Sequence, residues 1–99
     1  MADRPVELHA EAEEEYLNAL AWYCERSLPA GIKFERAFRQ AIERIENFPE
    51  RWPTYFVRFR KYTLQQFPFS VIYRNEPSRT FVLAVVHGRR RPGYWRGRA

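Results

Sequence analysis

The spacing of apolar residues changes from a helical to a strand-like period near Pro53, and this change limits the folds that the chain can adopt. In "AEEEYLNALAWYCERS" apolar side chains recur every three or four residues, as on one face of a helix. The same spacing returns further on and stops at Pro49, because proline disfavours a helical residue before it. We therefore predict an antiparallel helical hairpin of residues 11–27 and 30–47, joined at "LPAG".

Strand patterns occupy most of the remaining chain. "VEL" alternates apolar and polar residues and predicts a short strand within residues 5–9. Three further strands are predicted in "FVRFRKYTLQQ", "FPFSVIYRN" and "RTFVLAVVHG", whereas "PERWPTY" reads as a loop. The apolar phase of the first of these slips near Lys61-Tyr62, which indicates a bulge or a turn. The nearly continuous apolar run of the last one is typical of a central strand covered on both faces.

The element order is therefore β-α-α-β-β-β, and the fold class is α+β. We expect the helical hairpin to pack on one face of a mostly antiparallel four-stranded sheet, with the first strand beside the last. Cys24 is expected to be a buried core thiol. The side chains expected in the core are Phe38, Ile42, Ile45, Val71, Tyr73, Val82 and Ala84.

The length of 99 residues predicts a single domain, residues 1–99, in which residues 88–99 form a basic, aromatic C-terminal segment. An aromatic content of 17% helps so small a chain to bury enough surface. "MADRPVELHAEAEEEY" has no apolar signal region, and no apolar run reaches the roughly 20 residues that a membrane span needs. With one cysteine, the composition predicts a cytoplasmic protein without a membrane partner.

Charge is distributed unevenly along the chain. Residues 1–57 hold seven Arg or Lys and eleven Asp or Glu, a balance of 7 − 11 = −4. Residues 58–99 hold ten Arg or Lys and only Glu76 as an acid, a balance of 10 − 1 = +9. Segregated positive charge predicts an anionic partner, either a nucleic acid or an acidic protein segment.

Motifs for cofactors are missing from the sequence. There is no GxGxxG or GxxxxGK pattern, so no nucleotide cofactor is expected. The acidic cluster at residues 11–15 complements the dipole of the predicted helix start, and no further ligand follows it at metal-binding spacing. RNP-type aromatics, a GxxG loop and paired CxxC motifs are missing as well, which argues against a general RNA-binding module.

Four stretches together resemble the RelE/ParE superfamily of toxins from bacterial type II toxin–antitoxin modules. They are "VELHAEAEEEY", "ENFPERWP", "FPFSVIYR" and "VLAVVHGRRRPGYWRGR", and the last two are the most specific. The resemblance covers nearly the whole chain and is closer to the ParE-like branch, whose members are often called plasmid stabilisation proteins. It implies the fold predicted above and a cognate antitoxin that wraps the toxin, so that operator DNA is contacted only through the antitoxin.

The resemblance leaves the target open. ParE-like members inhibit DNA gyrase by binding it, whereas RelE-like members cleave mRNA in the ribosome. A third alternative is a relative that acts mainly as a co-repressor with its antitoxin. Ribonuclease chemistry needs a proton acceptor, a proton donor and groups that stabilise the phosphate. The residues that could serve are His87, Arg89, Tyr94, Arg74 and Lys61.

Departures from the nuclease pattern favour gyrase inhibition. Ser70 stands where some related nucleases have an arginine, and their loop carboxylate has no clear counterpart here. We expect the aromatic residues of the C-terminal segment to dock on the domain while its arginines reach an acidic surface of the target, and deletion of residues 89–99 to leave the fold largely intact. The residues predicted to bind the target are Arg89, Arg90, Arg91, Tyr94, Trp95 and Arg96.

Overall fold

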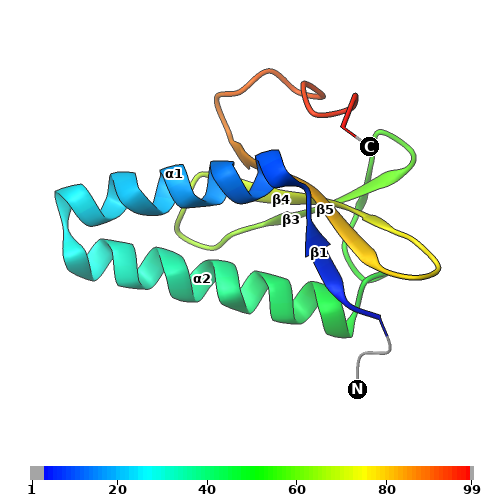
Figure 1. The fold of residues 1–99 in the computed structure, drawn as a ribbon, viewed down its shortest axis with the longest axis horizontal. Coiled ribbons are helices and arrows are strands. Elements are labelled where there is room, and N and C mark those ends of the chain that lie inside the picture. The colour runs from blue at the N-terminus through cyan, green and yellow to red at the C-terminus, as the bar shows by residue number, and fades with distance from the viewer. Residues whose placement is uncertain (1–3, 99) are drawn as a thin grey trace.

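A computed structural model describes residues 4–98. Two helices lie on one face of a five-stranded sheet, which confirms the predicted α+β class (Figure 1). The last residue of the predicted C-terminal segment, residue 99, lies outside the described residues. In chain order the elements are β1 (Val6–Leu8), α1 (Ala10–Arg26), α2 (Leu28–Asn47), β2 (Thr54–Tyr55), β3 (Phe59–Thr63), β4 (Phe69–Asn75) and β5 (Thr80–His87).

The strand order in the sheet is β1-β5-β4-β3-β2. β1 runs parallel to β5, and every other neighbouring pair is antiparallel, so the first strand lies beside the last as predicted. The predicted count of four strands is wrong, because Thr54–Tyr55, within the expected loop, pairs with β3. A strand of two residues is too short to show an alternating pattern in the sequence.

The helical hairpin turns at Ser27, which caps both helices. Its N–H donates to the Tyr23 carbonyl at 2.9 Å, and its Oγ accepts from the Ala30 N–H at 3.3 Å. α2 begins two residues earlier than predicted because Pro29 is tolerated in the first turn of a helix. Cys24 is exposed, so its predicted burial is wrong: one residue beyond Tyr23, it is rotated by about 100° off the apolar stripe of α1.

The helices bury one face of the sheet, which we call the helix face. Phe34, Ala41 and Ile45 of α2 have no exposed surface, and the Tyr16 and Phe38 rings stack with their centroids 4.0 Å apart. Predicted core residues that are buried here are Phe38, Ile45, Val71, Tyr73 and Val82. Ile42 is an exception, since it is only partly buried at the margin of the stripe.

The other face, which we call the outer face, carries a second apolar cluster of Phe59, Ile72, Phe81, Leu83, Ala84 and Trp95. The bulge or turn predicted near Lys61-Tyr62 is wrong, because β3 runs through these residues and pairs with β4 in regular register. The phase slips because Phe59 faces outward whereas Tyr62 faces the helices. The register shift lies instead between β4 and β5, where Leu83 is the additional residue.

Candidate functional site

The C-terminal segment, residues 88–98, leaves β5 and crosses the sheet to the hairpin of β2 and β3 (Figure 1). Turns redirect it, as predicted from Gly88 and Pro92-Gly93. Gly93 has a φ of +81°, and a Cβ there would lie only 3.2 Å from Phe56 Cζ. Glycine is therefore needed for both the backbone conformation and the close approach.

Trp95 anchors this segment in the outer cluster. Its side chain is 1% exposed and meets the Phe59 ring edge to face, with the centroids 4.7 Å apart. A buried indole of this size removes more apolar surface from water than any other residue of the segment. The aromatic docking is therefore present, but Trp95 belongs to the core and offers no surface to a target.

Glu15 of α1 is the second anchor. Its carboxylate accepts hydrogen bonds from the Tyr94 hydroxyl at 2.6 Å, the Val85 N–H at 2.9 Å and the Arg98 guanidinium at 3.0 Å. Burial alone would raise the pKa of Glu15, but the hydrogen bonds from Arg98 and Tyr94 outweigh it and hold the pKa below its usual value. The ionised carboxylate thereby ties the C-terminal segment to α1 and β5.

Arg98 completes the ion pair and also donates to the Leu83 carbonyl at 2.9 Å. Its side chain is 11% exposed, whereas the other arginines of the segment are open to solvent. Arg90 stacks over the Tyr94 ring at 4.0 Å, and Arg96 lies over the Phe56 ring at 4.9 Å. The exposed arginines are Arg89, Arg90, Arg91 and Arg96, all of which were predicted to bind the target.

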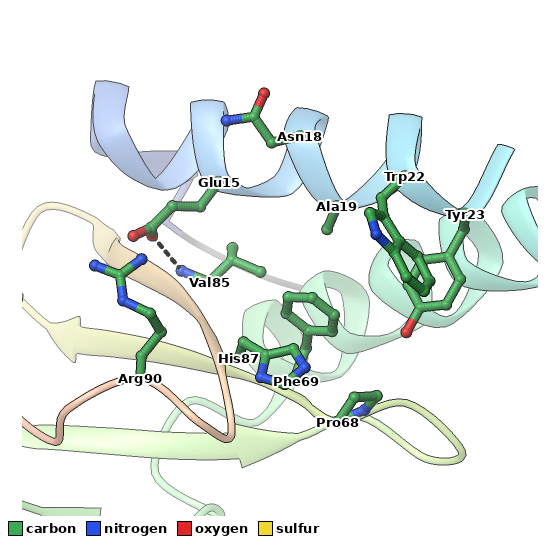
Figure 2. A pocket seen from close by; sticks show the side chains of 10 residues that line it. All are labelled: Glu15, Asn18, Ala19, Trp22, Tyr23, Pro68, Phe69, Val85, His87 and Arg90. Atoms are coloured by element: carbon green, nitrogen blue, oxygen red, sulfur yellow. Dashed lines mark hydrogen bonds between the residues drawn. The ribbon is translucent and has the colours of Figure 1, made fainter. Parts of the chain in front are cut away.

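A groove separates α1 from the end of β5 and has a volume of about 460 Å³. Figure 2 shows Glu15 and Arg90 at one end of it, and Trp22 and Tyr23 at the other. His87 lies between them, with its ring edge to face against Phe69. The groove thus combines an apolar floor with one cationic side chain, Arg90, and one carboxylate, Glu15, at the same end.

The residues predicted for ribonuclease chemistry do not gather at one point: His87 and Arg89 lie together at the end of β5, but Arg74 and Lys61 lie on the other face. His87 faces the groove on the helix face, and its Nδ1 accepts from the Arg89 N–H at 3.0 Å. Arg74 lies over Phe81 on the outer face, at the opposite end of β4 and β5, and is paired with Glu76. The ammonium group of Lys61 lies over the Tyr55 ring on that same face.

Tyr94 is also committed elsewhere, because its hydroxyl donates to Glu15. Burial and the neighbouring carboxylate raise its pKa well above the usual value, which makes it a poor proton donor.

Among residues 4–98, no group of three or more His, Cys, Asp or Glu side chains could hold a metal ion. No helix of this range is long and apolar enough to cross a membrane.

Comparison with known proteins identifies the family. The family described as "ParE toxin of type II toxin-antitoxin system, parDE" matches residues 6–92. The chain belongs to the ParE toxin family. This confirms the resemblance seen in the sequence, including its ParE-like character, and makes the chain the toxin component of a type II toxin–antitoxin system.

Solved structures give this ParE-family chain a related fold. A chain of the chromosomal ParDE TA system from P. aeruginosa aligns with a TM-score of 0.62 at 17% sequence identity, covering 85% of this chain and 95% of the other. At that identity the likeness concerns the fold alone. No curated protein sequence matches the chain.

The sequence analysis did not predict the Glu15–Arg98 ion pair that fastens the C-terminal segment of this ParE-family chain to α1. A signal existed for Glu15, because it lies three residues after Ala12 and four before Ala19, within the buried face of α1. A carboxylate in that position must find a partner when it is buried. Nothing in the sequence singled out Arg98, which is 83 residues away.

Proposed function

We propose that this toxin inhibits DNA gyrase by binding it, and that the C-terminal segment is its contact surface. The observation that carries the proposal is that the backbone of the C-terminal segment is anchored while most of its arginine side chains are exposed. Trp95 and the Glu15–Arg98 pair fix the segment, while Arg89, Arg90, Arg91 and Arg96 are exposed along it. Arginines on a preorganised backbone lose less entropy on binding an acidic surface than arginines on a loose tail.

The positions of the remaining polar residues support binding rather than RNA cleavage. A ribonuclease must bring its proton acceptor, proton donor and phosphate-binding groups to within hydrogen-bond reach of one phosphodiester. Here His87 is on the helix face and Lys61 and Arg74 are on the outer face. The hydroxyl of Tyr94 is occupied by Glu15.

A supercoiling assay with purified gyrase tests the proposal. The wild-type chain should inhibit supercoiling, and simultaneous replacement of the four exposed arginines by alanine should abolish the inhibition. His87→Ala is the matched control and should inhibit like the wild type. Two results together would contradict gyrase binding. The wild type would cleave mRNA in a translating extract without affecting supercoiling, and His87→Ala would abolish that cleavage.

We propose in addition that a cognate antitoxin covers the helical hairpin and the groove. Four large apolar side chains of the hairpin are exposed, and the groove adds an apolar floor beside Arg90. An antitoxin with apolar and acidic side chains would complement both. The exposed apolar residues are Leu17, Trp22, Leu28 and Ile32.

Co-expression with the product of the adjacent gene tests this part. A complex should form, and its affinity should fall only partly with added salt, because apolar contacts persist while exposed charge pairs are screened. Trp22→Ala should weaken the complex, whereas Gln40→Ala, on the exposed side of α2, should not. Failure to form a complex would contradict the proposed partner. We also propose that the toxin acts in the cytoplasm.

A further inference from the structure

The hairpin between β2 and β3 ends in an unusual turn of Phe56, Val57 and Arg58, which we call the hairpin tip. Phe56 has a φ of 50° and Val57 a φ of 63°, both in the left-handed region. A β-branched residue is rare there, because its Cβ substituents crowd the backbone. Glycine or asparagine would fit this turn without strain.

The side chain held in this strained conformation is also apolar and exposed. Val57 is 92% exposed and so gains little from burial in the isolated chain, whereas the neighbouring Phe56 is only 38% exposed. The turn is therefore unfavourable in both its backbone and its solvation. Local strain of this kind clusters at binding and active sites, where it holds a side chain in position.

The C-terminal segment packs against the hairpin tip. The Trp95 ring meets Phe56 edge to face with the centroids 5.6 Å apart, and Arg96 covers the same ring at 4.9 Å. Gly93 lies against Phe56 Cζ. The tip and the exposed Arg96 thus form one continuous surface, on the side of the molecule away from the α1–β5 groove.

The charge around the tip is positive. Arg58, next to Val57 in the chain, and Arg96, over the Phe56 ring, are both exposed, and Lys61 follows on β3. Between residues 51 and 98 the sequence has one acid, Glu76, which is bonded to two arginines. A complementary surface would have an apolar pocket surrounded by carboxylates.

A protein fits this surface better than a nucleic acid does. Bases stack on open aromatic faces, but Arg96 covers the ring of Phe56, and Trp95 and Tyr55 approach it edge to face. The outermost side chain, Val57, has no ring. We propose that the hairpin tip inserts Val57 into an apolar, acid-rimmed pocket of the target protein, with Arg58 and Arg96 pairing with its rim. This inference rests on the proposed function, in which the toxin acts by binding a protein.

Val57→Asn separates binding from folding. Asparagine tolerates the left-handed conformation, so the variant should be as stable as the wild type or more stable. It should nevertheless bind gyrase at least about tenfold more weakly, as expected for loss of a central apolar anchor. Gln66→Asn is the matched control, because Gln66 has a φ of 68° in the loop between β3 and β4 and lies outside the proposed surface.

Binding of each variant to immobilised gyrase, together with growth inhibition on induced expression, decides the proposal. Loss of binding and of growth inhibition in Val57→Asn, with both kept in Gln66→Asn, supports it. Unchanged binding in Val57→Asn overturns it. If the wild type inhibits growth without binding gyrase, the gyrase target is wrong, and growth still tests the tip: inhibition lost in Val57→Asn supports the tip, and inhibition kept overturns it. The proposal of a protein pocket is also overturned if the wild type binds a labelled DNA duplex but not gyrase, and Val57→Asn loses only this binding to the duplex.

Discussion

The two faces of the sheet are covered in different ways. Helices of 17 and 20 residues cover the helix face with apolar side chains repeated at every turn. The outer face is covered by an irregular segment that depends on one tryptophan and one ion pair. The helix face therefore distributes its stability over many contacts, whereas the outer face concentrates it in Trp95, Glu15 and Arg98, which leaves the other arginines of the segment free.

The largest effect is expected on the helix face, from Phe34→Ala. Phe34 has no exposed surface and packs against Tyr16, Tyr23, Phe67 and Phe69. Its replacement should lower the free energy of unfolding by roughly 3–5 kcal/mol, as for other buried aromatic residues. Denaturant unfolding followed by circular dichroism measures this loss. A loss below about 1 kcal/mol would show that the face is not closely packed.

On the outer face, Trp95→Ala should lower the free energy of unfolding by about 3 kcal/mol, because a segment without regular structure can partly collapse into the space left. Tyr94→Phe, which removes only the hydrogen bond to Glu15, should lower it by about 1 kcal/mol. Hydrogen exchange should quicken in residues 88–98 of Trp95→Ala more than in α2. Equal losses of unfolding free energy in Trp95→Ala and Tyr94→Phe would mean that Trp95 is not the main anchor of the segment.

Glu15→Ala should cost about 2 kcal/mol, because it leaves the Arg98 charge and the Val85 N–H without their partner. Glu11→Ala is its control: Glu11 lies 3.6 Å from Arg98 but is 62% exposed, and its loss should change stability by less than about 0.5 kcal/mol. The same unfolding measurement compares the two variants. Equal losses of unfolding free energy in Glu15→Ala and Glu11→Ala would mean that the Glu15–Arg98 pair stabilises the chain no more than an exposed ion pair does.

The smallest effect is the pH dependence of this tie. The folded chain lowers the pKa of Glu15, so its contribution is present above the pKa of the unfolded chain and is lost as the pH falls through the lowered value. The difference in unfolding free energy between the wild type and Glu15→Ala should therefore shrink from about pH 7 to about pH 3. A difference that grows on acidification would contradict the assigned direction.

Periodic burial made most of the fold predictable. The stripes of both helices and the continuous apolar run of β5 placed the hairpin and the central strand correctly, because each pattern repeats over many residues. Single positions at the margins of a stripe were less certain: Ile42 is half-buried and Cys24 is exposed. A rotation of about 100° per residue separates such positions from the core.

The cover of the outer face was less predictable. The turns at Gly88 and Gly93 were visible in the sequence, but the depth of Trp95 depends on the second apolar cluster, which forms only in the folded sheet. This burial changes one expectation. Deletion of residues 89–99 should now destabilise the chain, because it uncovers Leu83 and Ile72, and should not leave the fold intact.

The place of β5 in the sheet also sets when the toxin can mature during translation. β5 lies between β1 and β4, yet the ribosome makes it after every other strand, and Trp95 and Arg98 later still. A nascent chain that ends before residue 80 has no strand with which to join β1 to the sheet. Long-range pairing of this kind delays folding until late in synthesis. The chain therefore completes its core only once the ribosome has made the segment that holds the exposed arginines.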